Sequence, residues 1–246
     1  MKSNSRRPQS TRHAFTLVEL IVVLMILVGL AAVLIPAVTD MVARTNRSTA
    51  SSNISEIAGS IQRYDAQYMA YPDNFDSLMT DLIGTDLNTL QAGLTSVTAD
   101  VTLTAPTRVP LTAAGLLNVG VHAVGDATFE LPTTTALTDT TILKGLTAAA
   151  QQTLGLETAG VAGKYIVLGV GALSDMNGKT MFDAPVHFPR ESSTNPEVAY
   201  ARFIAVFQIT DGTDPLDRAK FVGVIAPDGT GLSGEMDGYF EIASNN

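Results

Sequence analysis

The chain has 246 residues, of which 46% are hydrophobic, and a formal net charge of −9, so it is long enough for one or two domains with a buried core. An acidic body repels phosphate, which argues against nucleic acid as a partner of its bulk surface. The absence of cysteine excludes disulfides, thiolate metal sites and cysteine nucleophiles.

The N-terminus combines a basic leader with a long apolar run. Residues 1–14 hold four of the 15 basic residues and none of the 24 acidic ones, and Glu19 is the only charged residue from position 15 to position 38. A helix of this length reaches ~36 Å, enough to cross a hydrocarbon core of ~30 Å. We therefore expect a transmembrane helix over about 15–38. The positive-inside bias places residues 1–14 in the cytoplasm and the rest of the chain outside.

Two general classes of segment fit this run incompletely. A secretory signal peptide has an apolar region of only ~7–15 residues and small residues before its cleavage site, whereas this run is longer. A plain membrane anchor explains the length, but it leaves Glu19 as an energetic cost because a charge inside a span is expensive.

A third interpretation rests on a family resemblance. The sequence AFTLVE at residues 14–19, with basic residues before it and a long apolar stretch after it, resembles the N-terminus of type IV pilins and type II secretion pseudopilins. The resemblance implies that a prepilin peptidase cuts between Ala14 and Phe15, N-methylates Phe15, and leaves the apolar segment in the mature protein. The family usually has glycine before the cut, where this chain has Ala14.

The resemblance also implies an assembly role for Glu19, which would pair with the freed amino group of Phe15 in a neighbouring subunit. Opposite charges attract strongly at low dielectric, and an unpaired charge there is costly, so a subunit would favour the register that pairs both. A local alternative stays open. Phe15 and Glu19 are four residues apart, one helical turn, so a single chain could satisfy its own glutamate.

Gly29 and Pro36 interrupt the apolar run and predict a kink. Proline removes the hydrogen bond to the carbonyl four residues earlier, and glycine adds backbone freedom. The resemblance implies local unwinding between the two residues, and a tolerated kink in a membrane helix is the alternative.

The helix is expected to continue well beyond the apolar run. Apolar residues from 54 to 68 recur at the i, i+3, i+4 spacing of one helical face. Tyr71 precedes Pro72, and a residue before proline disfavours helical geometry. One long helix over about 15–68 is therefore predicted, which resembles the helical spine of pilins.

Residues 69–246 are predicted to form an extracytoplasmic head, in which residues 84–160 are a candidate insertion. A short helix capped by Asp73 or Asn74 is expected first. Apolar, β-branched and aromatic runs then predict strands at 164–170, 200–209, 219–226 and 238–243, the second and third joined as a hairpin. The predicted fold class is α+β, with a head of antiparallel sheet packed on the second half of the long helix.

The head offers little catalytic chemistry. Gly169-Val-Gly171 lacks the third glycine of a dinucleotide fingerprint, and no pair of histidines has metal-binding spacing. We therefore expect neither an enzyme nor a cofactor. The segment from Asp228 to Asp237 is rich in oxygen ligands, and Asp228, Glu235 and Asp237 are candidates for calcium, as in a late loop of some pseudopilins. A solvated turn is the alternative.

The resemblance implies a structural subunit of a pilin-like filament, either a type II secretion pseudopilin or a minor type IV pilin. Its implied partners are the prepilin peptidase/methyltransferase, other pilin-like subunits, an inner-membrane assembly platform and the lipid bilayer. It would span the inner membrane once and then enter a pilus or pseudopilus. The alternative function is a membrane-anchored extracytoplasmic binding module that does not polymerise.

Overall fold

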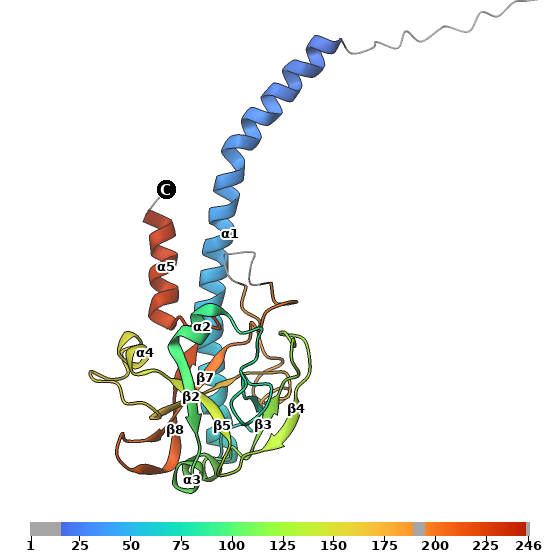
Figure 1. Cartoon of the computed structure of the whole chain (residues 1–246). Coiled ribbons are helices and arrows are strands. Elements are labelled where there is room, and N and C mark those ends of the chain that lie inside the picture. Colours follow the sequence, from blue (N-terminus) through green and yellow to red (C-terminus); the bar gives the residue numbers. More distant parts are fainter. Residues whose placement is uncertain (1–15, 189–194, 245–246) are drawn as a thin grey trace, which may run out of the picture. The chain divides into compact units, whose positions relative to one another are not determined.

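The computed structural model describes residues 16–188 and 195–244. The chain divides into two compact units, Met1–Val42 and Ala43–Asn246. Helix α1, Leu17–Tyr68, is continuous and contributes to both units (Figure 1). The long helix predicted for about 15–68 is thus confirmed over its described residues.

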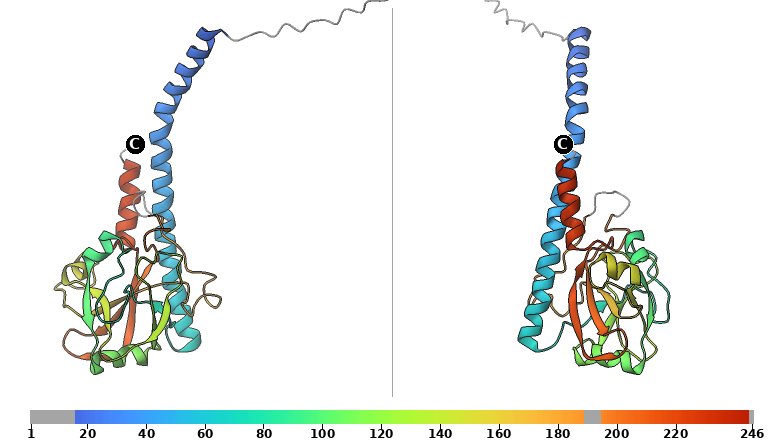
Figure 2. Two further views of the ribbon diagram at one scale, coloured as in Figure 1. Left: turned by 45° about the vertical axis from the view of Figure 1, so that its right-hand side comes forward. Right: turned by 90° about the vertical axis from the view of Figure 1, so that its left-hand side faces the viewer.

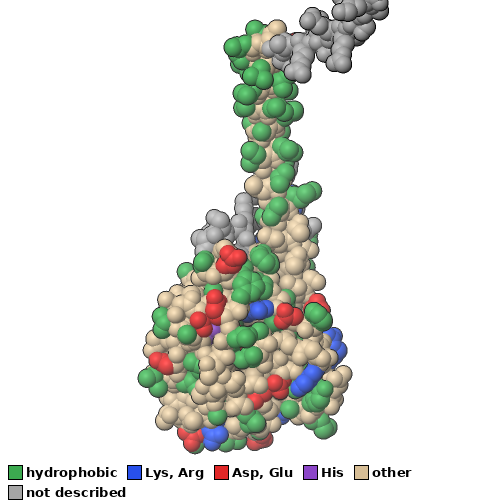
Figure 3. Space-filling model, turned by 90° about the vertical axis from the view of Figure 1, so that its right-hand side faces the viewer, with side chains coloured by type: hydrophobic (Ala, Val, Ile, Leu, Met, Phe, Trp, Pro, Cys, Tyr) green, Lys and Arg blue, Asp and Glu red, His purple; other side chains and the backbone are tan. Residues whose placement is uncertain are grey.

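The first part of α1 exposes its apolar side chains on every side. All described side chains from residue 17 to residue 35 are exposed, and hydrophobic groups cover this part of the helix in the space-filling view (Figure 3). This part of α1 is long and apolar enough to cross a membrane. An all-round apolar surface of this kind is stable in hydrocarbon rather than in water.

The second part of α1 is amphipathic, as its spacing predicts. Its buried side chains lie three to four residues apart and include Ile54, Ile57, Ile61 and Tyr64. They belong to the same buried cluster as side chains of the sheet, among them Phe207. The helix therefore changes from a uniformly exposed apolar surface to one with a single buried face.

The strands form one mixed sheet. They are β1 (Phe75–Asp76), β2 (Thr98–Thr102), β3 (Asn118–Val121), β4 (Thr133–Ala136), β5 (Ile142–Leu146), β6 (Tyr165–Gly169), β7 (Ile204–Thr210) and β8 (Pro215–Ile225). The order β2-β5-β6-β1-β3-β4 is extended by β7, which pairs with both β6 and β8. The three predicted strands at 164–170, 200–209 and 219–226 correspond to β6, β7 and β8, and the β7–β8 hairpin is confirmed.

The expectation of a purely antiparallel sheet is wrong at one pair. β1 and β3 are parallel, with Phe75 opposite Val119 and Asp76 opposite Gly120. Parallel neighbours need a long crossover, and the chain makes it by passing through β2 and two short helices before it returns as β3. β2 and both helices of this crossover lie within residues 84–160, as do β3, β4 and β5, so the candidate insertion supplies four strands of the common sheet.

Four shorter helices complete the described part of the chain (Figure 2). They are α2 (Ala92–Val97), α3 (Ala105–Ala113), α4 (Ala148–Thr153) and α5 (Leu232–Ser244). Two expectations fail here. Residues 238–243 lie in α5 rather than in a strand, since a short apolar run fits either period. No helix follows Asp73, because its carboxylate accepts hydrogen bonds from the backbone of Leu117 and Asn118 instead of capping a turn.

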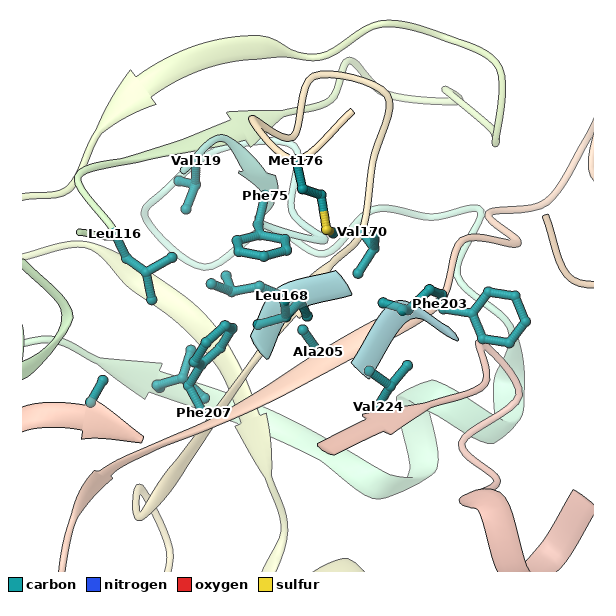
Figure 4. Close-up of a cluster of buried hydrophobic side chains, with 14 of the residues drawn as sticks. Phe75, Leu116, Val119, Leu168, Val170, Met176, Phe203, Ala205, Phe207 and Val224 are labelled. Atoms are coloured by element: carbon teal, nitrogen blue, oxygen red, sulfur yellow. The ribbon is translucent and has the colours of Figure 1, made fainter. Parts of the chain in front are cut away.

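A buried cluster lies on each face of the sheet, and strand β7 contributes to both. Alternate residues of a strand point to opposite faces, and Ala205 and Phe207 join the cluster that contains the α1 side chains. We call this cluster the helix-side core (Figure 4). Val206 and Ile204 join a second cluster with Leu94 and partly buried Leu154, which we call the far-side core.

Replacing Ile57 with alanine should destabilise the body strongly. Ile57 is 0% exposed within the helix-side core, and removing a buried isoleucine side chain costs about 2–5 kcal/mol of unfolding free energy. Urea unfolding of the detergent-solubilised full chain measures the change. Ile83→Ala is the matched control because Ile83 is 80% exposed. Equal losses in both variants would contradict the placement of Ile57 in the core.

Candidate functional site

The start of α1 is closed by a capping box formed by Thr16 and Glu19. The Glu19 Oε2 atom accepts hydrogen bonds from the Thr16 backbone N–H at 2.9 Å and from the Thr16 hydroxyl at 3.0 Å. The Glu19 backbone N–H in turn donates to the Thr16 hydroxyl at 3.3 Å. This reciprocal pair satisfies backbone donors that the first turn of a helix otherwise leaves unpaired.

Glu19 therefore has a partner within its own chain, and that partner is Thr16. Ala14 and Phe15, the two residues of the predicted cleavage site, lie outside the described residues. Both bonds from Thr16 use Oε2, and Oε1 receives no hydrogen bond from the residues that the structure describes. The cap thus occupies one carboxylate oxygen and leaves the other for a second donor.

The predicted interruptions at Gly29 and Pro36 both lie within the continuous helix α1. The single chain does not show the unwinding implied by the resemblance to pilins, so that part of the kink prediction stays a prediction. A Cβ atom at Gly29 would meet nothing within 4 Å. Packing among the described residues therefore does not explain why this position is a glycine.

A second polar site forms where α5 begins. His187, Asp228 and Glu235 bring one possible ligand atom each to within 4.8 Å of one another. Of the three predicted calcium ligands, Asp228 and Glu235 belong to this group and Asp237 does not. Residues 232–244 are helical, and positions two apart on a helix face different sides. Asp237 is accordingly exposed, whereas the side chain of Glu235 is fully buried.

The carboxylate of Glu235 is already balanced by donors from three parts of the chain. Arg47 in α1 donates to Oε2 at 3.0 Å, the Thr230 hydroxyl donates to Oε1 at 2.8 Å, and His187 Nε2 lies 3.5 Å from Oε1. Burial disfavours the charged form, but the hydrogen bonds from His187 and Thr230 and the charge of Arg47 outweigh it and lower the pKa of Glu235.

This arrangement is suited to holding α5 against α1. Calcium takes six to eight oxygen ligands, and here the guanidinium of Arg47 already lies beside one oxygen of Glu235. A cation that used Glu235 would have to displace or tolerate that positive charge. Calcium at Asp228 and Glu235 remains a prediction, while the ion pair accounts directly for a buried carboxylate at this position.

A third polar group lies inside the sheet and escaped sequence reasoning. The Tyr200 hydroxyl donates to Asp76 at 2.6 Å, and Nε2 of His122 lies 3.4 Å from the same carboxylate. All three side chains are buried, so a substrate has no access to them. A Cβ atom at Gly171 would overlap the Asp76 carboxylate, which explains the glycine-lined turn after β6 as a close approach to a buried acid.

One of the missed contacts had a signal in the sequence, and the other did not. Thr16-Leu-Val-Glu19 is a capping-box pattern just before an apolar run. Asp228 and Glu235 were singled out, but their companions Arg47 and His187 lie far from them in the chain, and no local spacing connects them.

Comparison with known proteins adds no relative. The scan against protein-family models, the search of curated proteins and the search of solved structures each found no match.

Replacing Glu235 with glutamine should lower the free energy of unfolding by about 1.5–3 kcal/mol at neutral pH, the usual contribution of hydrogen bonds to a charged group. The folded-state pKa of Glu235 lies below its ordinary 4.5. The stabilisation from Glu235 is therefore complete above the ordinary pKa of 4.5 and is lost as the pH falls through the lower folded-state pKa. Urea unfolding over a series of acidic pH values measures both effects.

Asp237→Asn on the same helix is the control because its side chain is exposed. It should leave stability near neutral pH unchanged within about 0.5 kcal/mol. A Glu235→Gln variant that matches this control at every pH would contradict the structural role of the ion pair.

Proposed function

We propose that this chain is a structural subunit of a pilin-like filament, either a type II secretion pseudopilin or a minor type IV pilin, with no catalytic role. One observation carries the proposal: the 52-residue helix α1 starts directly after Thr16, is closed there by the capping box of Thr16 and Glu19, and is apolar on all sides over its first part. Directly before the cap lies the sequence Ala14-Phe15, which resembles a prepilin cleavage site.

The second part of α1 serves as the support of the head, with the sheet packed on it. The shared helix-side core supports this arrangement, and so do polar contacts from the loops and strands. Arg218 of β8 forms an ion pair with Asp65 of α1, and Lys179 donates to the hydroxyl of Tyr64 at 3.2 Å. Apolar burial and ion pairs thus attach the head to the second part of α1.

The precursor is a single-pass protein of the inner membrane with its N-terminus in the cytoplasm and its head outside. The four basic residues of the leader support this orientation. A prepilin peptidase cleaves after Ala14 and methylates Phe15, and an inner-membrane platform then assembles the mature subunit with other pilin-like subunits. Because the first part of α1 is apolar on every side, it can pass from lipid into a core of packed helices without exposing a polar face.

Glu19 carries two roles in this proposal. Within one chain it closes α1 through Thr16. In the filament its second carboxylate oxygen accepts the charged amino group of Phe15 from a neighbouring subunit. The cap uses Oε2 among the described contacts, so both interactions fit one carboxylate, and the low dielectric of a helical core strengthens the charged one.

A membrane-anchored binding module that does not polymerise is the second candidate. The observation that favours it is the same capping box, because Glu19 already has a partner without any neighbour. The two candidates differ in processing and in the response of Glu19 to substitution.

Mass spectrometry of the N-terminal peptide from membrane-extracted protein tests the processing step. The expected mature protein begins at N-methylated Phe15, because Ala14 is the next smallest residue after the family's usual glycine. Replacing Ala14 with glycine should leave the site of cleavage unchanged. A chain that retains Met1, or one that begins at any other residue, would contradict a prepilin-type subunit.

Substitutions at Thr16 and Glu19 separate capping from assembly. Glu19→Gln keeps an oxygen that can accept the cap hydrogen bonds but loses the charge, so filament incorporation should fall about tenfold or more if an ion pair is lost at low dielectric. Thr16→Val removes the hydroxyl of the cap and should cost only about 0.5–2 kcal/mol of helix stability. Incorporation is measured by immunoblotting of sheared filaments against membrane-retained protein.

Thr16→Ser, which keeps the hydroxyl, is the control. Should Thr16→Val impair incorporation as strongly as Glu19→Gln while Thr16→Ser does not, capping alone would explain Glu19, and the intersubunit pairing would be withdrawn.

A further inference from the structure

The last helix of the body carries three exposed apolar side chains on one side. Leu232, Met236 and Phe240 of α5 follow one another at intervals of four residues, which places them on one side of a helix. We call them the α5 stripe. Their exposed fractions are 40%, 47% and 60%, so the stripe becomes more exposed toward the end of α5. Single exposed apolar residues are common, but three on one side of a helix form a surface that a partner can cover.

A neighbouring side of α5 is held against α1. The side chain of Glu235 is fully buried and forms an ion pair with Arg47 of α1 at 3.0 Å. Met236 is the next residue and lies about 100° further around the helix. The ion pair with α1 therefore fixes the direction in which the stripe faces.

α5 lies at the end of the body where the apolar part of α1 joins it. The α1 side chains of the helix-side core start at Ala50, and Arg47 comes about one turn earlier. Beyond Glu235, α5 runs beside α1 and away from the sheet (Figure 1 and Figure 2). Phe240 follows Glu235 by about 8 Å of helix. It is thus level with the turn of α1 around Ala43, the residue with which the body begins.

The expected membrane surface lies close to Ala43 along the chain. Val38 ends the apolar run and precedes Ala43 in the same continuous helix by about 8 Å of helical rise. The headgroup region outside the hydrocarbon core is about 5–8 Å thick. Membrane helices tilt by about 20° on average, and a tilt toward a helix packed roughly 9 Å away lowers that helix by about 3 Å. The end of α5 can therefore reach the headgroup region.

We propose that the α5 stripe rests on the bilayer that α1 crosses, with Phe240 deepest among zwitterionic phospholipid headgroups and Met236 behind it. Helices that lie at a membrane surface use Phe, Leu and similar side chains for this contact. The inference deepens the proposed function and rests on one part of it, the crossing of a membrane by α1. The precursor touches the bilayer twice, so its head is held in one orientation, and α5 has to leave the lipid when the subunit does.

Apolar contact, not charge, holds α5 at this surface. Residues 232–244 contain no lysine or arginine, so α5 has no group that attracts anionic headgroups. The stripe is most exposed at the end nearest the apolar run, which fits lipid as the occupant, whereas a second copy of the chain has no reason to cover that end more than the other. The contact is weak by itself, but α1 tethers the chain to the bilayer and supplies a high effective concentration.

Fluorescence quenching by brominated lipid tests the contact on the full chain in vesicles. The chain has no tryptophan, so Phe240→Trp introduces a single probe and keeps an aromatic ring in the stripe. In phosphatidylcholine vesicles with bromine near the top of the acyl chains, its emission should fall about twofold, because the apolar side of an interfacial helix lies roughly 5–10 Å deep. Phe129→Trp is the matched control, since Phe129 is 58% exposed against 60% for Phe240, and its emission should stay unchanged.

A second pair of variants tests the stripe itself. In the Phe240→Trp chain, Met236→Asp places a charge in the stripe and should reduce the quenching to the level of the Phe129→Trp control, because a carboxylate resists leaving water. Ser233→Asp adds the same charge at an exposed position outside the stripe and should leave the quenching unchanged. Urea midpoints show that both variants remain folded. An equal loss of quenching in both would overturn the role of the stripe.

Val28→Trp, at an exposed position in the first part of α1, separates this inference from the proposed function. Bromine placed deep in the acyl chains should quench this probe if α1 crosses the bilayer. Quenching at Val28 without quenching at Phe240 would overturn the inference alone, and loss of both would also refute the membrane span. Quenching at Phe240 alone would support the stripe and refute the span.

Two other results would also overturn the lipid contact. Emission from Phe240→Trp that shifts to shorter wavelength only as more protein is packed per lipid, without quenching by bromine, would show that a second copy covers the stripe. Equal quenching of Phe129→Trp and Phe240→Trp would show that the whole body adsorbs to the vesicle rather than α5.

Discussion

The structure depends on a single helix that has to be stable in two different surroundings. Over its first part, α1 exposes apolar side chains on every side, which water disfavours and hydrocarbon accepts. Over its second part, Ile54, Ile57 and Ile61 are buried in the helix-side core. The hydrophobic effect therefore favours burial of both parts: the body of the same chain buries the second part, and the first part is long and apolar enough to cross a membrane.

Much of the fold was predictable from periodicity. The long helix, its end near Tyr68 and the three strands β6, β7 and β8 all have strong local patterns. The parallel pairing of β1 with β3 depends on a crossover of distant segments, which no local pattern encodes. The helix predicted after Asp73 is absent for the same reason. The Asp73 carboxylate accepts hydrogen bonds from the backbone of Leu117 and Asn118, which lie more than 40 positions away.

The polar sites likewise divide into contacts that a local sequence pattern encodes and contacts between distant segments. Glu19 was singled out from its place in an apolar run, and the partner that holds it lies three residues away in a recognisable pattern. Glu235 was also singled out, but as an oxygen ligand in a loop. Its burial and its pairing with Arg47, which is 188 residues away in sequence, follow only from the folded chain. A contact between residues close in the sequence could therefore be predicted from the sequence, whereas the partners that neutralise a buried charge could not.

The capping box has a consequence for how a leader could be removed. The three hydrogen bonds that close α1 join Thr16 and Glu19, and residue 14 supplies none of them. Under the proposed processing, the peptidase would act on Ala14 and Phe15, whereas the capping box uses Thr16 and Glu19. Under that proposal, a substitution at position 14 could slow or prevent cleavage while the first turn of the helix stays closed by Thr16 and Glu19.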